Sequence, residues 1–227
     1  MASIAVALSK DLPNGRVMRA IVSEQDLVVW RSKSGILSAW ENRCPHRGMR
    51  LSHGFVRGEA LACMYHGWHY DKSATCRYIP AHPELEPPET IRAQEFSSIE
   101  KGGLIWVSVD GSLEEPLIDE NLTPLRSINF QCASKTVQEV ITKSTKLAGD
   151  TDPFNFTTKA AGYHHWVLFS EKKELNLHLF FHELPNNACK IHALIDKDCP
   201  AQIQKQISRM MESWRRSAET DYEVSAK

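Results

Sequence analysis

Two short segments of the sequence each pair a cysteine with a histidine. The first has the pattern C-x-H, at Cys44 and His46. After a gap of 16 residues the second has the pattern C-x-x-H, at Cys63 and His66. Thiolates and imidazoles are the side chains that soft and borderline metal ions prefer in proteins. The residue types and their spacing therefore predict a metal centre built from two loops.

The distribution of the four donors bears on which metal they suit. A Cys2His2 zinc finger takes both cysteines from one loop and both histidines from a short helix. Here each loop offers one of each. That arrangement favours a Rieske-type [2Fe-2S] centre, in which one iron takes two thiolates and the other takes two imidazoles. Such a centre is a one-electron relay; a structural zinc ion, or four unconnected residues, is the alternative.

Glycines and aromatic residues accompany both segments. Gly48 and Gly67 follow the two ligand loops, where the backbone must approach a cluster closely and donate N–H groups to its sulfurs. We expect Trp68 and Tyr65 to shield the cluster from water, a role compatible with that of ordinary core aromatics.

The match to a known family extends beyond the four donors. Residues 43–80 resemble the cluster-binding segment of the Rieske non-heme iron oxygenases, and the further shared positions are Arg47, Gly48, Leu51, Ser52, Gly54, Val56, Gly58, Tyr65, Gly67, Trp68, Asp71, Cys76, Ile79 and Pro80. Respiratory-chain Rieske proteins carry an extra cysteine in each ligand loop, joined as a disulfide, where this sequence has Met49 and Tyr65. The resemblance therefore implies an oxygenase-type centre, in which the cluster and metal ligands are Cys44, His46, Cys63 and His66.

The elements that must position these loops are predicted to be short strands separated by turns. The predicted strands are 17–22, 26–31, 37–41, 60–64, 69–70, 76–79, 91–96 and 104–109. No window of this region sustains helical periodicity. Residues 1–110 are therefore predicted to form an all-β domain, which the resemblance identifies as a Rieske β-sandwich.

The second half of the chain has a different pattern. Residues 111–124 are acidic, contain two prolines and are predicted to be a linker. In residues 125–227, a hairpin is predicted from 174–181 and 189–195, and a helix from Pro200 with the apolar stripe Ile203, Ile207, Met210, Met211 and Trp214. The fold class is thus mainly β followed by α+β. A meander from Thr136 through 167–169 is similar to the end of a helix-grip domain, which we expect to be shortened and to serve in docking or oligomerisation.

The resembled family needs a second iron, which its helix-grip domain holds through two histidines and one carboxylate. No segment after residue 110 resembles the helix that carries those ligands. Asp150 and Asp152 have no histidine within the next ten residues. We expect surface or packed roles for the histidines of this half, which are His164, His165, His178, His182 and His192. The prediction is that this chain has no catalytic residues of its own.

Composition excludes several classes of function. The chain has 227 residues, and its 27 lysines and arginines balance 28 aspartates and glutamates without blocks of like charge. Nucleic-acid and membrane-surface binding are therefore not expected. No apolar run approaches the roughly 18 residues needed to span a bilayer, and the start lacks a basic region, so a cytoplasmic protein is predicted. Six cysteines are too few for a disulfide scaffold.

The resemblance implies a role in a multicomponent oxygenase. The leading hypothesis is a Rieske electron-transfer subunit that carries electrons from an NAD(P)H-dependent reductase or a ferredoxin. The acceptor would be a mononuclear Fe(II) on a partner catalytic subunit, in a trimer-based hetero-oligomer that hydroxylates or oxidatively demethylates a small organic substrate. One alternative is a self-sufficient small oxygenase with ligands drawn from His164, His165, Asp150 and Asp152; another is a free-standing Rieske ferredoxin.

Overall fold

The computed structural model describes residues 3–111, 115–147, 154–162 and 164–225. The chain divides into two compact units, Met1–Pro116 and Leu117–Lys227. The division lies inside the predicted linker, 111–124. Strand β11 (Leu122–Phe130) begins within the last three positions of that linker. It can include Pro124 because β11 is an edge strand and Pro124 lies beside a register shift, where the sheet tolerates a missing N–H donor.

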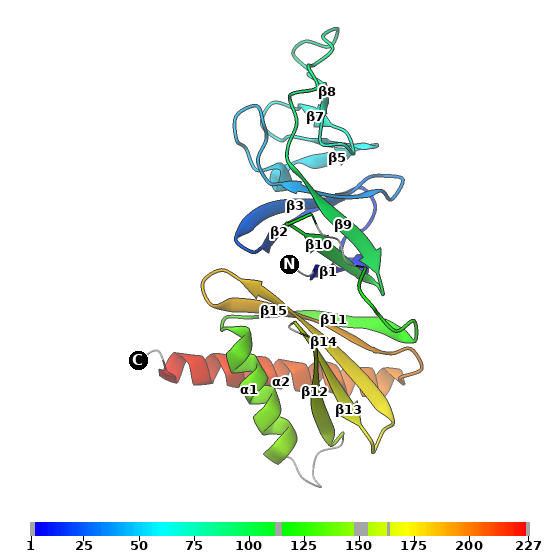
Figure 1. The fold of residues 1–227 in the computed structure, drawn as a ribbon, viewed down its shortest axis with the longest axis vertical. Helices are drawn as coiled ribbons and strands as arrows, with labels where there is room; N and C mark the ends of the chain where they lie inside the picture. The colour runs from blue at the N-terminus through cyan, green and yellow to red at the C-terminus, as the bar shows by residue number, and fades with distance from the viewer. Residues whose placement is uncertain (1–2, 112–114, 148–153, 163, 226–227) are drawn as a thin grey trace. The chain divides into compact units, whose positions relative to one another are not determined.

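Two antiparallel sheets make up the described part of the first unit (Figure 1). The six-stranded sheet has the order β1 (Ile4–Leu8), β10 (Leu104–Ser108), β9 (Glu95–Lys101), β4 (Leu37–Glu41), β3 (Gln25–Arg31) and β2 (Arg16–Val22). The four-stranded sheet has the order β5 (Phe55–Arg57), β6 (Ala60–Ala62), β7 (His69–Tyr70) and β8 (Cys76–Tyr78). Two short 3₁₀ helices, η1 (Ser9–Asp11) and η2 (Leu51–His53), lie between strands.

Strand β3 is buried on both faces, which explains its unbroken apolar run. Val28 and Trp30 pack in one core cluster, and Leu27 and Val29 pack in another. Alternate residues of a strand point to opposite faces, so β3 separates the two cores. The first of these clusters also contains Cys44, Cys63 and Tyr70 and therefore forms the base of the two cysteine–histidine loops.

The second unit is a five-stranded antiparallel sheet with two helices, in its described residues. The strand order is β11, β15 (Ala188–Asp196), β14 (Leu175–Leu184), β13 (His165–Ser170) and β12 (Phe156–Gly162). Helices α1 (Ser134–Leu147) and α2 (Ala201–Ser225) both contribute to its apolar core (Figure 1). The predicted stripe of α2 faces this core, with Ile207 and Met211 fully buried. Neither described helix is long and apolar enough to cross a membrane.

The meander predicted from Thr136 through 167–169 is wrong in its first part, because residues 134–147 form helix α1, whereas residues 167–169 lie in β13 of an antiparallel meander. The β-branched residues of α1 favour strands by propensity. Val137, Val140 and Ile141, however, have helical spacing and are all buried in the core, and this packing outweighs the propensity. The predicted strand 91–96 is also displaced: β9 runs from Glu95 to Lys101, and Ile91 and Ala93 pack against the loops instead.

Candidate metal centre

The two cysteine–histidine segments have the same backbone hydrogen bonding. In the loop after β4, the Cys44 N–H donates to the Met49 carbonyl at 2.8 Å, and the Gly48 N–H donates to the Cys44 carbonyl at 2.8 Å. In the loop after β6, Cys63 N–H and Trp68 carbonyl form the equivalent bond at 2.9 Å, as do the N–H of residue 67 and the Cys63 carbonyl, also at 2.9 Å. The two loops are therefore structural copies of one another.

A glycine in the left-handed region closes each loop. Gly48 has φ +73° and Gly67 has φ +69°, a conformation that glycine adopts without strain. At Gly67 a Cβ atom would lie 3.0 Å from the Pro80 Cγ atom, so the backbone of the second loop also packs too closely against Pro80 for a larger residue. At Gly48 a Cβ would meet the Arg43 side chain at 3.1 Å.

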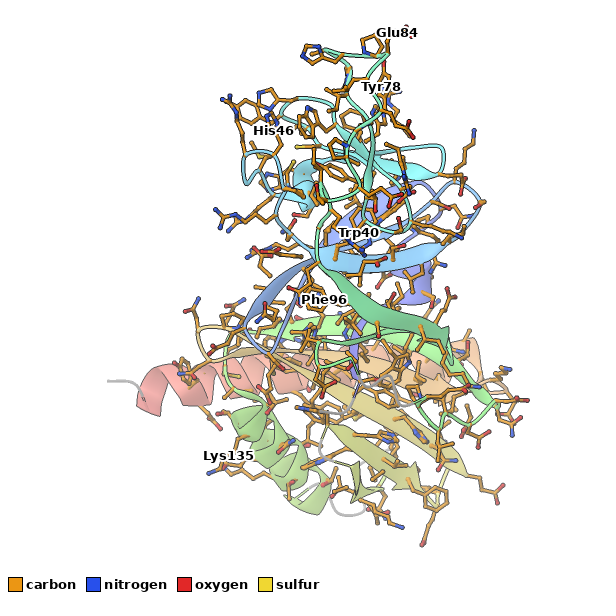
Figure 2. The ribbon with its side chains drawn as sticks, turned by 45° about the horizontal axis from the view of Figure 1, so that its top comes forward. Trp40, His46, Tyr78, Glu84, Phe96 and Lys135 are labelled. Atoms are coloured by element: carbon orange, nitrogen blue, oxygen red, sulfur yellow. The ribbon has the colours of Figure 1, made fainter. Side chains whose placement is uncertain are left out.

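The imidazoles meet at the outer edge of these loops. The rings of His46 and His66 are 4.7 Å apart between centroids, in an edge-to-face arrangement. Trp68 stacks on His46 at 4.0 Å with an interplanar angle of 5°, and Tyr65 contacts the His66 ring at 3.9 Å. Figure 2 shows His46 at the rim of the unit. These ring contacts restrict the orientations that each imidazole can adopt.

The thiols lie beneath the imidazoles. Cys44 is 3% exposed and Cys63 is 2% exposed, whereas His46 is half-buried and His66 is exposed. The site therefore has a buried sulfur side and an imidazole side that reaches the surface. Buried and exposed donors of different types suit two metal positions at different depths.

The buried sulfurs have hydrogen-bond donors. The Tyr70 hydroxyl lies 3.1 Å from the Cys44 Sγ atom, and backbone N–H groups of Tyr65 and His66 are directed at the Cys63 sulfur. Burial raises the pKa of the Cys63 thiol, the Tyr65 N–H opposes this rise, and the nearby Cys44 adds to it. A bound metal would hold both sulfurs as thiolates, to which the same donors would bond.

His46 is suited to metal binding in its neutral form. Burial lowers its pKa, and the neighbouring His66 and the Arg47 guanidinium lower it further. A neutral imidazole keeps one ring nitrogen free as an acceptor, which is the state that ligates metals.

The structure brings the two predicted thiols into contact with one another, and likewise the two predicted imidazoles. Within the described residues, no three His, Cys, Asp or Glu side chains form a group that could hold one metal ion. A Rieske-type [2Fe-2S] cluster requires two donors at each of its two irons. Two buried thiols behind two surface imidazoles supply that set, so the residues present fit this cluster.

Sequence reasoning missed the contact of the Tyr70 hydroxyl with the Cys44 sulfur. Tyr70 was placed correctly in the strand 69–70, and it is fully buried in the cluster that contains both cysteines. Its contact with Cys44 joins positions 26 residues apart, and no local pattern encodes that distance. The stacking of Trp68 on His46 was likewise not anticipated, although its position two residues after His66 placed it in the same loop.

The second unit contains a histidine pair that the sequence did not indicate. His165 Nε2 and His178 Nδ1 are 3.0 Å apart, on neighbouring strands β13 and β14. Burial, together with the nearby His178, lowers the pKa of His165 to about 4. His192 bonds instead to the Ser127 hydroxyl at 2.7 Å. Asp150 and Asp152, the carboxylates of the self-sufficient alternative, lie outside the described residues.

Comparison with known proteins agrees with this picture. A family model described as the Rieske [2Fe-2S] domain matches residues 2–92. The chain is 30% identical over 229 residues to the oxidoreductase NdmD of Pseudomonas putida, covering 94% of this chain and 39% of NdmD. It is 41% identical over 76 residues to the methylxanthine N1-demethylase NdmA of the same species, covering 34% of this chain and 22% of NdmA. The chain thus spans 39% or less of these two relatives.

A solved structure of NdmA from Pseudomonas putida CBB5 superimposes with a TM-score of 0.75 at 21% identity, over 96% of this chain and 80% of that chain. At this identity the likeness shows the fold, and it extends over both units. It confirms the predicted fold class, a Rieske β-sandwich followed by a helix-grip-like sheet with a C-terminal helix. Residues 2–92 of the chain thus carry a Rieske [2Fe-2S] domain, and the chain is similar to proteins named an oxidoreductase and a demethylase.

Proposed function

We propose that this chain is the Rieske electron-transfer subunit of an oxygenase system. Cys44 and Cys63 would hold the inner iron of a [2Fe-2S] cluster, and His46 and His66 the outer iron. When bound, the cluster supplies a site that accepts and releases one electron at a time. The observation that carries the proposal is the depth order of the four donors, with buried thiols and surface imidazoles.

The chain's own residues would do three things for this role. The core around Tyr70 and Trp40 excludes water from the sulfur side. The Tyr70 hydroxyl and the loop N–H groups donate hydrogen bonds to the thiolates, which favours the more negative, reduced state. The imidazole edges give an electron a short path to a protein that docks against them.

The partners follow from the same argument. We propose that electrons arrive from an NAD(P)H-dependent reductase or a ferredoxin and leave for a mononuclear iron on a partner catalytic subunit, in a hetero-oligomer. The chain is similar to a protein named a methylxanthine N1-demethylase, which supports oxidative demethylation or hydroxylation of a small organic substrate as the reaction served.

Metal analysis and electron paramagnetic resonance of the purified chain test the proposal. We expect about two irons and two inorganic sulfides per chain and a Rieske-type signal after reduction. Cys63→Ser should abolish the signal. Cys199→Ser, which changes a buried cysteine of the second unit, should keep it.

A reconstituted wild-type protein without a Rieske signal, or a Cys63→Ser variant that retains it, contradicts the ligand assignment. The role as a subunit has a separate test in oxygen consumption. The isolated, reduced protein should not turn over substrate, and turnover without any partner refutes the division between two polypeptides.

A further inference from the structure

The surface around the imidazoles combines exposed apolar side chains with cations. We call Arg43, Arg47, Met64, Tyr65 and His66 the cluster face. Met64 is 54% exposed and Tyr65 is 55% exposed, which is more than any described large hydrophobic residue except Leu117. Exposed tyrosine, methionine and arginine are the residue types that are enriched where proteins bind one another. The composition of this face is therefore typical of an interface.

The two arginines of the cluster face differ from most of the arginines in the same unit. Arg50 pairs with Asp26, Arg77 pairs with Asp71, and Arg92 pairs with Glu95, while Arg57 stacks on Phe55. Among the described residues, no carboxylate lies within ion-pair distance of Arg43 or Arg47. Both side chains are exposed. Their positive charges are thus not compensated within the described part of the chain.

A pocket of about 300 Å³ lies beside His46 between these cations. Three arginines contribute to its wall, Arg43, Arg47 and Arg92, against one carboxylate, Glu41. The acidic side chain of Glu84 lies in the segment between β8 and β9, apart from His46 (Figure 2). The local charge beside the imidazole is positive, and an acidic side chain of another protein would be attracted to it.

We propose that the cluster face docks the acidic surface of the protein that donates the electron. This inference rests on the proposed function and adds the chemistry of the partner. Tyr65 and Met64 would form the apolar centre of the contact. Arg43 and Arg47 would pair with carboxylates of the donor, beside the imidazole that receives the electron.

The change of charge on reduction favours a donor over an acceptor at this face. In the transfer, the reduced donor loses one electron and the diferric cluster gains it, becoming a ferrous–ferric pair. Cys44 and Cys63 as thiolates with two neutral imidazoles leave the oxidised cluster neutral, so reduction makes it negative by one charge. An acidic partner is then held more weakly. An acidic donor thus prefers the oxidised chain, which is its substrate, and leaves after transfer.

Stopped-flow reduction of the intact, cluster-loaded chain tests the inference. The probe is a dithionite-reduced plant-type [2Fe-2S] ferredoxin of strongly negative net charge. We expect a second-order rate constant that falls with rising salt. The double variant Arg43→Gln/Arg47→Gln should lose roughly tenfold of this rate at low salt and most of the salt dependence.

The matched control is Lys205→Gln/Arg209→Gln, which removes two exposed charges from α2 in the second unit. It should keep the wild-type rate and salt dependence. An equal loss in the control, or no loss in the cluster-face variant, overturns the docking site. The visible spectrum of each variant shows that the cluster is assembled, and its reduction potential shows how much of any rate change comes from a change in driving force. A wild-type chain that assembles no Rieske cluster refutes the proposed function instead.

The direction of transfer has its own measurement. A gallium-substituted form of the same ferredoxin cannot exchange electrons, so its dissociation constant can be measured with the oxidised and the reduced chain. We expect binding to the oxidised form to be roughly two- to tenfold tighter. Equal affinity, or tighter binding to the reduced form, overturns the assignment of the donor.

Discussion

We expect the Tyr70 hydroxyl to raise the reduction potential of the proposed cluster, and Tyr70→Phe removes this hydroxyl while leaving the ring in place. The hydroxyl lies 3.1 Å from the Cys44 sulfur, and both groups are buried, so water does not replace the lost donor. A hydrogen bond to a charged group contributes about 1.5 to 3 kcal/mol. The reduced cluster carries one more negative charge, so we take the difference between redox states as about 1 to 2 kcal/mol.

For a one-electron couple, about 1.4 kcal/mol corresponds to about 59 mV. The Tyr70→Phe variant should therefore have a potential roughly 40 to 90 mV below that of the wild type. Protein-film voltammetry, or redox titration followed by circular dichroism, measures this shift. The control is Tyr78→Phe, an exposed tyrosine on β8 with the same chemical change. An unchanged or raised potential in Tyr70→Phe would refute the role of this hydroxyl.

Two further predictions concern stability. Gly67→Ala combines a left-handed φ with a contact of 3.0 Å to Pro80, so it should lower the free energy of unfolding by roughly 2 to 3 kcal/mol in urea titrations. Gly58→Ala has φ +60° but nothing within 4 Å, and should lose only about 1 kcal/mol; equal losses would contradict the close approach at residue 67. Burial lowers the folded pKa of His165 to about 4, below the unfolded value of about 6.5, so the unfolded chain binds more protons between these values. Lowering the pH from 7 to 5 should then reduce the free energy of unfolding of the wild type by roughly 1 to 2 kcal/mol more than that of His165→Gln. The control is His82→Gln, which changes an exposed histidine and should behave like the wild type. Parallel pH profiles of the wild type and His165→Gln would contradict this role of His165.

Local patterns predicted most of the elements that hold the site. Residues 37–41 and 69–70 are strands with the predicted bounds, because their flanking turns and apolar alternation are local signals. The hairpin of β14 and β15 was also predicted, and Asn186 and Asn187 turn it with positive φ. Strand β1 was missed, because its residues, 4–8, lie at the start of the chain without a turn signal before them.

The sequence predicted candidate ligands, and the fold determines what surrounds them. Residue types, spacing and the family resemblance pointed to Cys44, His46, Cys63 and His66 as ligands, in the patterns C-x-H and C-x-x-H. The contacts of Tyr70 with Cys44 and of His165 with His178 depend on strand register between distant segments. A shift of one residue would turn either side chain to the opposite face, so such contacts require the three-dimensional structure.

The matching hydrogen bonds of the two loops have a consequence for how the cluster is acquired. Each loop is closed by its own backbone groups, from Cys44 to Met49 and from Cys63 to Trp68, and none of these bonds involves a metal. The conformational entropy of the loops is therefore lost when the chain folds, and inserting iron and sulfide loses little more. In the apoprotein, the two ligand loops should then already have the conformation that binds the cluster, before any protein delivers iron and sulfide. After loss of the cluster, for example by oxidation, the loops would keep this conformation and could bind a new cluster.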